Sequence, residues 1–201
     1  MGLLAGQKII VASHNAGKVE EMRAILRPFE LEVITASEIG LKEPVEDGDS
    51  FEANARIKAI SARDSTGLAA ISDDSGLVVP ALGGLPGIYS ARWAGPEKNY
   101  HKAIMLIREQ LGSLNKNAHF ICALAVALPS GACSTFLGQV FGELAFPPRG
   151  TRGFGYDPIF QPNGFSETFG EMEAEKKHSI SHRAQAFTKM QHDFFRRENY
   201  L

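Results

Sequence analysis

The chain has 201 residues, of which 44% are hydrophobic, so it can form a substantial core and is not a disordered tail. Its 21 basic and 23 acidic residues nearly balance, and this charge gives no indication of a protein that binds duplex DNA or an anionic membrane. The longest purely apolar run, residues 120–128, is too short to cross a bilayer, and the N-terminal residues lack the pattern of a signal peptide.

The first half of the chain predicts strands that alternate with helices. A strand over 8–12 precedes a polar loop and a helix with a regular apolar face. A second strand is expected over 31–34, followed by a helix over 51–63 with Ser50 as its N-cap. A third strand then runs into a turn-like, carboxylate-bearing segment within 69–76.

The second half predicts a glycine- and proline-rich loop, a helix, a hairpin of two strands, a second glycine-rich loop and a closing helix. These elements are expected at 82–87, 97–111, 119–128 with 134–146, 150–157 and 181–198. The two cysteines, Cys122 and Cys133, have no metal-ligand spacing and fit a reducing, cytoplasmic compartment. We therefore predict a mixed α/β fold in a single domain over 1–201, with an elongated central sheet and flanking helices that form two lobes around an active-site cleft.

The loop after the first strand has the composition of an anion site. Its sequence is Ser13-His14-Asn15-Ala16-Gly17-Lys18, and it leads directly into a helix, whose first backbone N–H groups and dipole favour a phosphate. It is not a Walker A loop, because Ala12 replaces the first glycine and Val19 replaces the magnesium-binding Ser or Thr. The alternative is an ordinary turn with an exposed lysine.

Two groups of carboxylates predict a magnesium site. In an extended segment, Asp73 and Asp74 point to opposite faces, so only one of them can enter a given cleft. Glu46 lies in an acidic loop before the second helix, and Mg²⁺ is usually held by one or two carboxylates together with substrate phosphates. If the loop and the strand meet, Glu46 and Asp74 can supply them. Taken singly, each group is more typical of a solvated turn.

Aromatic and basic residues near the C-terminus suggest recognition of a nucleobase. The loop Gly153-Phe154-Gly155-Tyr156-Asp157-Pro158 alternates glycines with rings on which a base can stack. Ser181-His182-Arg183 opens the closing helix, and Lys176-Lys177-His178 precedes it. A tightly packed turn is the alternative for the loop. The spacing of His178 and His182 permits a shared helix face, but no third zinc ligand is evident.

Taken together, these blocks resemble the inosine/xanthosine triphosphate pyrophosphatase family, whose members hydrolyse nonstandard purine nucleoside triphosphates. The resemblance also rests on Phe51-x-x-Asn54-Ala55-x-x-Lys58-Ala59, on Asp73-Asp74-Ser75-Gly76-Leu77 and on the segment 81–92. The six blocks occur in one order along the sequence, and the resemblance covers nearly the whole chain. The resemblance implies a two-lobed fold, a homodimer, Mg²⁺, and hydrolysis of ITP, dITP or XTP to the monophosphate and pyrophosphate.

The resemblance also implies roles for individual residues. Asp74 would be the proton acceptor and a metal ligand, Glu46 a second metal ligand, and Asp73 either metal support or a structural anchor. The expected substrate contacts are Ser13, His14, Asn15, Ala16, Gly17, Lys18, Lys58, Ser75, Arg92, Phe154, Gly155, Tyr156, Asp157, Lys177, His182 and Arg183. Among these, the residues from Phe154 onward would recognise the purine, and the cations Lys18, Lys58 and Arg92 would face the phosphates.

Two positions depart from the family pattern. Ser13-His14 stands where Thr-Gly is commoner, which puts the approach of the backbone to the phosphates in question, and Pro80 stands where Asp is common. Alternatives to the leading hypothesis are a pyrophosphatase for modified pyrimidine triphosphates, a non-catalytic nucleotide-binding module, and a single-stranded nucleic-acid binder. The balanced charge argues against the last of these, and we expect no nucleic-acid or membrane partner.

Overall fold

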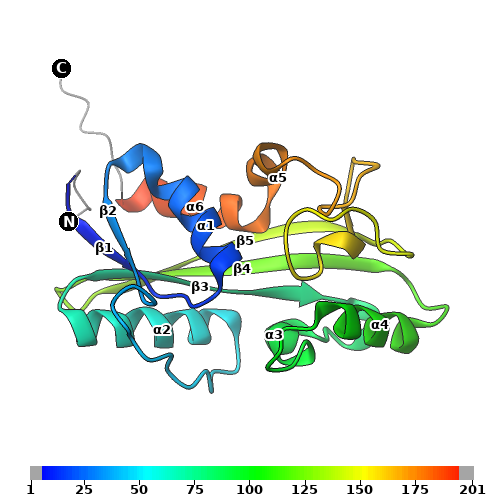
Figure 1. The fold of residues 1–201 in the computed structure, drawn as a ribbon, viewed down its shortest axis with the longest axis horizontal. Helices are drawn as coiled ribbons and strands as arrows, with labels where there is room; N and C mark the ends of the chain where they lie inside the picture. The colour runs from blue at the N-terminus through cyan, green and yellow to red at the C-terminus, as the bar shows by residue number, and fades with distance from the viewer. Residues whose placement is uncertain (1–5, 195–201) are drawn as a thin grey trace. The chain divides into compact units, whose positions relative to one another are not determined.

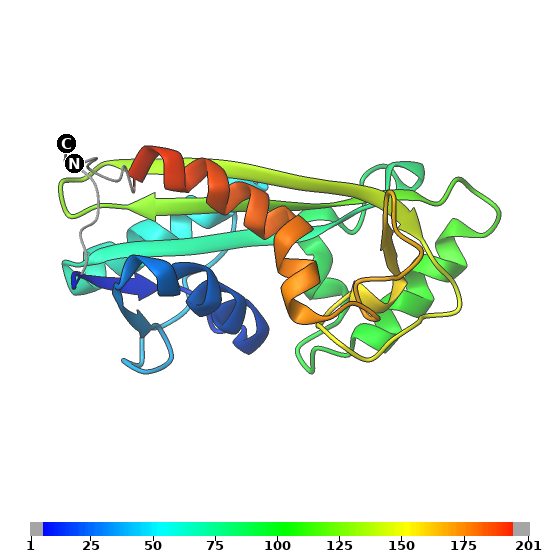
Figure 2. The same cartoon turned by 90° about the horizontal axis from the view of Figure 1, so that it is seen from above.

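The computed structural model describes residues 6–194 and confirms the mixed α/β fold (Figures 1 and 2). Its six-stranded sheet has the strand order β2-β1-β3-β4-β5-β6. Strand β1 pairs in parallel with β2 and β3, whereas β5 and β6 are antiparallel. The parallel pairs arise from the strand–helix alternation of the N-terminal half, because a parallel neighbour requires a crossover connection.

The chain divides into two compact units. The first unit contains the described residues up to Asp74, residues 123–138 and the described residues from Arg183 onward. The second unit contains residues 75–122 and 139–182. Strands β3 (Ala69–Val78), β4 (Asn117–Ala127) and β5 (Cys133–Leu144) contribute residues to both.

The first unit is built from parallel strands and the helices that cover them. Its remaining strands are β1 (Lys8–Val11) and β2 (Glu32–Thr35), and its helices are α1 (Ala16–Leu26), a 3₁₀ turn (Arg27–Phe29), α2 (Phe51–Thr66) and most of α6 (His182–Phe194). Helix α2 lies on one face of these strands, and α1 and α6 lie on the other (Figure 1). Strand β3 contacts both helical layers through its side chains.

Local sequence explains why α2 begins and ends where it does. Ser50 is its N-cap, as predicted, and its hydroxyl accepts a hydrogen bond from the Ala53 backbone N–H at 3.2 Å. Gly67 follows the helix with φ +70°, in the left-handed conformation that glycine adopts without steric cost. The buried face of α2 includes Ala62, which packs in a small core cluster with Ile10 of β1 and Ala70 of β3.

The predicted turn within residues 72–76 is wrong. Strand β3 continues without interruption to Val78, and Ser72, Asp73 and Asp74 are all buried. Composition alone suggested a solvated turn, but each carboxylate has a cation beside it, and the Ser72 hydroxyl donates to the Ala55 carbonyl of α2 at 2.5 Å. Paired charges and satisfied hydrogen bonds allow acidic residues to remain inside a strand.

The second unit contains most of the aromatic core. Its helices are α3 (Ser90–Trp93), α4 (Tyr100–Leu111) and α5 (Ala174–Ile180), its short strand is β6 (Phe160–Pro162), and 3₁₀ turns cover Pro80–Leu82, Gly87–Tyr89 and Asp157–Ile159. Phe120 packs edge-to-face on Phe160 and stacks with Phe169, at centroid distances of 4.8 and 6.0 Å. Contacts of this geometry stabilise the core beyond the burial of the rings.

Several predicted boundaries shift. Helix α4 starts at Tyr100 rather than residue 97, because the Asn99 side chain caps it by accepting from the Lys102 N–H. The hairpin is confirmed, with its turn closed by the Leu128 N–H on the Ala132 carbonyl. Strand β6 and helix α5 were not predicted, and the closing helix begins at His182 after a break at Ser181. Residues 195–198 of the predicted closing helix lie outside the described residues.

No helix within residues 6–194 combines the length and the apolar character that a membrane span requires.

Candidate functional site

The predicted anion loop forms the entry to α1. Asn15 is the N-cap, with its side-chain oxygen accepting from the Lys18 N–H at 3.2 Å, and the Ser13 hydroxyl accepts from the Asn15 N–H at 3.2 Å. Ala16 and Gly17 are the first two residues of the helix, so their backbone N–H groups have no acceptor within it. These two donors and the positive end of the helix are suited to a phosphate oxygen.

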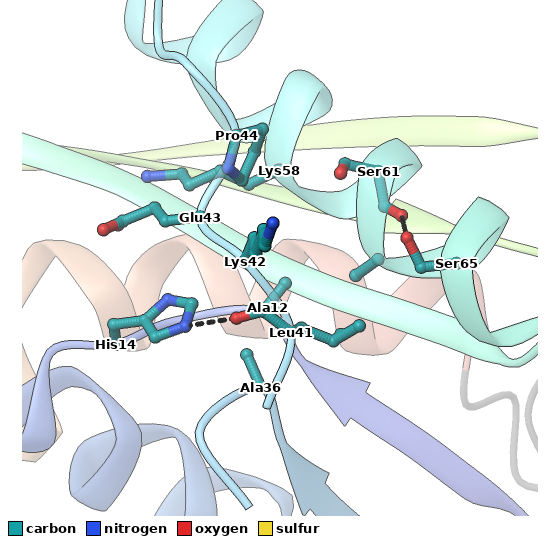
Figure 3. A pocket seen from close by; sticks show the side chains of 11 residues that line it. Ala12, His14, Ala36, Leu41, Lys42, Glu43, Pro44, Lys58, Ser61 and Ser65 are labelled. Carbon is teal, nitrogen blue, oxygen red and sulfur yellow. Dashed lines mark hydrogen bonds between the residues drawn. The ribbon is translucent and has the colours of Figure 1, made fainter. Parts of the chain in front are cut away.

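His14, which departs from the family pattern, is part of this loop, and its side chain extends to a pocket beside it. Its ring lies at a pocket that is also lined by Ala12, Ala36, Leu41, Lys42, Glu43, Pro44, Lys58, Ser61, Ala62 and Ser65 (Figure 3). Its Nε2 is 2.8 Å from the Leu41 carbonyl oxygen, and because a carbonyl only accepts, Nε2 carries the hydrogen. The side chain thus ties the loop to the segment that leads to the acidic residues.

Asp73 is held by two cations on the face of β3 that α1 and α6 cover. Lys18 Nζ lies 3.2 Å and Arg183 Nη2 2.8 Å from Asp73 Oδ2, and the Asp73 side chain is 1% exposed. Arg183 also pairs with Glu21 of α1. Asp73 therefore joins strand β3 to both helices through one buried ion-pair network.

Asp74 faces the opposite helical layer. Its Oδ1 is 3.4 Å from Lys58 Nζ of α2, and its Oδ2 is 3.4 Å from the Asn54 side-chain nitrogen. The same Lys58 ammonium is 2.6 Å from Glu46 Oε1. The structure thus brings together Glu46, Lys58 and Asp74, and it places the two adjacent aspartates on opposite faces, as strand alternation predicted.

The two environments shift the aspartate pKa values in opposite directions. Burial raises the pKa of Asp74, and the nearby cations Lys58 and Lys18 only partly offset this effect. Burial acts in the same sense on Asp73, but the combined attraction of Lys18, Arg183 and Lys58 outweighs it and holds the Asp73 pKa well below its usual range. Asp73 is therefore a fixed negative charge, and Asp74 is the member of the pair suited to exchange a proton.

Lys58 is a stable cation at this position. Burial alone lowers its pKa, but the negative charges of Asp74, Glu46 and Asp73 together raise it above the ordinary lysine value. The carboxylates of Glu46 and Asp74 both contact the Lys58 ammonium group.

These residues fit a magnesium ion in their donor chemistry. Carboxylate oxygens are the ligands that Mg²⁺ prefers, and one or two of them suffice when substrate phosphates complete the coordination. Among residues 6–194, no group of three or more His, Cys, Asp or Glu side chains gathers as a ready-made metal cage. The pair that fits is Glu46 and Asp74, whereas Asp73 faces the other layer and has the contacts of a structural anchor.

In the second unit, the aromatic loop and helix α5 meet at a buried ion pair. Lys177 Nζ is 2.6 Å from Asp157 Oδ2, with side chains 5% and 4% exposed. The Asp157 carboxylate also accepts from the Phe154 N–H at 2.8 Å. The ammonium lies over the rings of Phe154 and Phe169, at 4.8 and 5.6 Å from their centroids. A charged donor, a charged acceptor and a partly exposed ring are therefore fixed within one small area.

The remaining predicted residues of this unit have mixed environments. The buried Tyr156 donates its hydroxyl to the Ser90 carbonyl at 2.8 Å, and His182 stacks on Phe120 at 4.9 Å, so both rings belong to the packed core. Gly153, the first residue of the aromatic loop, has φ +72° and no space for a Cβ beside the Asp157 carboxylate. Gly155 has φ +68°.

Ser75 is half-buried on β3, and Arg92 is exposed on α3 with its guanidinium 5.1 Å from the Tyr89 ring centroid.

The structure gives Arg183 partners that the sequence did not suggest. We predicted that it recognises the purine, but its side chain is 1% exposed and pairs with Glu21 and Asp73 in the first unit. Glu21 itself was missed, and the only signal was an acidic residue next to the apolar face of α1. His178 and His182 belong to different helices, α5 and α6, so they share no helix face that would present them to zinc.

Comparison with known proteins shows where this chain belongs. A model of the Ham1 family matches residues 9–193. A protein of Zymomonas mobilis named dITP/XTP pyrophosphatase is 50% identical over 187 residues, which cover 91% of this chain and 90% of that protein. A protein of Caulobacter vibrioides with the same name is 50% identical over 193 residues, covering 94% and 99% of the two chains.

Solved structures give the same result. A HAM1 protein from Coxiella burnetii superimposes with a TM-score of 0.85 at 36% identity, over 94% of this chain and 98% of that one. A nucleoside-triphosphatase / dITP/XTP pyrophosphatase from Mycobacterium abscessus gives 0.75 at 39% identity, over 92% and 98%. These matches confirm the resemblance predicted from the ordered sequence blocks, and the chain belongs to the Ham1 family.

Proposed function

We propose that the protein is a Mg²⁺-dependent pyrophosphatase that hydrolyses dITP, XTP and ITP to the nucleoside monophosphate and pyrophosphate. The observation that carries the proposal is the convergence of Glu46 and Asp74 on one cationic point, in the same unit as the Ser13–Lys18 loop. The names of the relatives from Zymomonas mobilis and Caulobacter vibrioides support the substrate class.

The triphosphate is assigned to the first unit. The Ala16 and Gly17 amides would bind phosphate oxygens, while Lys18 and Lys58 would offset the negative charge that repels an attacking water. A magnesium ion held by Glu46 and Asp74 would supply further positive charge to the phosphates. Asp73, which stays ionised, keeps the Lys18 ammonium in place through their 3.2 Å contact.

Asp74 is the proposed general base. Because burial raises its pKa, its carboxylate binds a proton more readily than an ordinary aspartate does. It would take one proton from the water that attacks the α-phosphorus, as the new P–O bond forms and the bond to pyrophosphate breaks. Water is then added across the α,β-phosphoanhydride, and the products are the monophosphate and pyrophosphate.

Purine recognition is assigned to the Asp157–Lys177 pair and the Phe154 ring. Inosine and xanthosine carry a 6-oxo acceptor where adenine has an amino donor, so the Lys177 ammonium favours them over adenine. Phe154 provides a surface for stacking. Guanine shares the 6-oxo group, so its rejection must depend on its 2-amino group. His182 is retained as a purine-binding candidate, and Ser75 and Arg92 as further substrate contacts, whereas Arg183 is assigned to the buried network with Glu21 and Asp73.

Three further properties belong to the proposal: the first follows the family resemblance, the second the cysteine usage and the third the balanced charge. We expect the protein to form a homodimer, to act in the cytoplasm and to need no nucleic-acid or membrane partner. Light scattering coupled to size-exclusion chromatography tests the first of these, with a mass of twice the chain mass as the expected result.

A substrate panel with separate detection of pyrophosphate and orthophosphate tests the activity. Purified protein with Mg²⁺ is expected to release pyrophosphate from dITP, XTP and ITP much faster than from ATP, GTP or modified pyrimidine triphosphates. Preference for the pyrimidines would favour the alternative substrate class. Binding of ITP without turnover would favour a non-catalytic nucleotide-binding module, and either result would overturn the proposal.

A further inference from the structure

Glu46 and Asp74 come from segments that require something to hold them together. Glu46 lies in an irregular loop between β2 and α2, whereas Asp74 is part of a strand. A magnesium site requires the separation of its ligands to be fixed, because the ion tolerates little deviation from its preferred geometry. Lys58 contacts both carboxylates, but its flexible side chain does not fix the backbone of the loop relative to the strand.

Asn54, in the first turn of α2, contacts both segments. It has 0% exposure, and its Oδ1 accepts from the Gly48 N–H at 2.9 Å while its Nδ2 donates to Asp74 Oδ2 at 3.4 Å. A carboxamide carries an acceptor and a donor on two separate atoms of one short side chain, so it can contact both segments at once. The second contact is long, but it occupies the Asp74 oxygen that does not face Lys58.

Gly48 supplies an independent observation. A Cβ at this position would lie 2.7 Å from Asn54 Oδ1, 2.7 Å from the Ala53 Cβ and 3.0 Å from the Asn54 backbone nitrogen. The φ of Gly48 is not in the left-handed region, so a requirement for unusual backbone geometry does not explain the glycine. What the position requires is close approach of the loop to the start of α2.

We propose that Asn54 is a positioning residue that sets the distance and orientation of Glu46 relative to Asp74, with Gly48 as its obligatory partner. Asn54 anchors the loop two residues from Glu46 and fixes the rotation of the Asp74 carboxylate, so that Oδ1 faces the point shared with Glu46. It acts through these carboxylates and does not contact substrate. The inference rests on the proposed function, because it assigns Asn54 a role in binding the metal of that reaction.

Three substitutions separate the parts of this role. Asn54→Asp keeps an acceptor for the Gly48 N–H but removes the donor to Asp74 and adds a negative charge beside it. Asn54→Ala removes both contacts. Gly48→Ala leaves Asn54 unchanged and displaces the loop. Ser50→Ala is the matched control, since it removes the N-cap of the same helix without a contact to Asp74 or Gly48.

The test uses Mn²⁺ as a paramagnetic probe for the carboxylate site and measures free Mn²⁺ by electron paramagnetic resonance. Loss of a group that orients metal ligands typically weakens metal affinity by about 10- to 100-fold. We expect Asn54→Ala and Gly48→Ala to show a loss of this size and to need correspondingly more metal for ITP hydrolysis. Ser50→Ala is expected to bind Mn²⁺ as wild type does, although its melting temperature falls.

Hydrogen exchange provides a readout that does not depend on metal or activity. The Gly48 amide is expected to be protected in wild type and in Asn54→Asp, and to exchange faster in Asn54→Ala. If Asn54→Ala does not fold, Asn54→Asp and Gly48→Ala still test the two contacts separately. Wild-type Mn²⁺ affinity in both Asn54→Asp and Gly48→Ala, in an enzyme that hydrolyses ITP, would overturn the inference alone. A wild-type protein that neither binds Mn²⁺ nor hydrolyses ITP would overturn the proposed function with it.

Discussion

Asp73 and Asp74 are adjacent in β3, yet the protein gives them opposite chemical properties. Asp73 points to α1 and α6 and is paired with Lys18 and Arg183, which lower its pKa. Asp74 points to α2, where burial raises its pKa. Strand alternation thus separates a fixed charge from a group that can accept a proton, and it allows the two to be tested by the same substitution.

Asp74→Asn is expected to lower kcat by about 100- to 10,000-fold, the usual contribution of a general base, while the fold is kept. Above its raised pKa the ionised Asp74 carboxylate is less favourable in the folded protein than in the unfolded chain, so neutral Asn is expected to leave the melting temperature unchanged or higher. Steady-state kinetics and calorimetry measure both effects. A variant with wild-type kcat would remove Asp74 from the role of base.

Asp73→Asn is expected to destabilise the protein strongly, by about 3–5 kcal/mol, because it leaves the buried Arg183 charge and the half-buried Lys18 charge without their shared carboxylate. For a group with a lowered folded pKa, the stabilisation is present above the unfolded value of 3.8 and is lost as pH falls toward the folded value. Urea unfolding at pH 7 measures the loss. Stability equal to that of Asp74→Asn would show that the network is not structural.

The titration of Asp74 in the metal-free protein is expected to reflect its buried position. Because burial raises its pKa, the Asp74 carboxyl should take up a proton at a higher pH than an ordinary aspartate does. Carboxyl ¹³C NMR across the acidic range, with Asp74→Asn to assign the signal, measures this shift. A pKa at or below the ordinary aspartate range would contradict the assigned environment.

Phe154→Ala is expected to raise KM for ITP by about 5- to 150-fold, which corresponds to the ~1–3 kcal/mol lost when a base no longer stacks on an aromatic ring. Phe154 is only partly buried, so the melting temperature should fall little. Phe165→Ala is a suitable control, because this ring also lies under a lysine of α5 but has no proposed contact with substrate. Equal effects of the two variants on KM would argue against stacking on Phe154.

Much of the first unit was predictable from local sequence. Ser50 as an N-cap, the loop before α1 and the opposite faces of Asp73 and Asp74 depend on capping and strand periodicity, which act over a few residues. The continuation of β3 through Ser72–Gly76 was not predictable, because it depends on Lys18, Lys58 and Arg183, which are far away in sequence.

Side-chain partners were the least predictable part of the candidate site. Arg183 has the motif of a base-binding residue, but its buried partner Glu21 lies 162 positions away and has no sequence signal that points to it. Helix α5 was missed because its seven residues are too short to give a clear apolar periodicity. Asn54 was visible in the sequence only as part of a family block, and its two contacts required the structure.

The most direct test of the account is hydrolysis of dITP in H₂¹⁸O with Mg²⁺, followed by mass spectrometry of both products. Attack of water at the α-phosphorus predicts one ¹⁸O atom in the monophosphate and none in the pyrophosphate. Label in the pyrophosphate would place the attack at the β-phosphorus, and release of labelled orthophosphate would place it at the γ-phosphorus. Either result would contradict the assignment of Asp74, Glu46 and the Ser13–Lys18 loop.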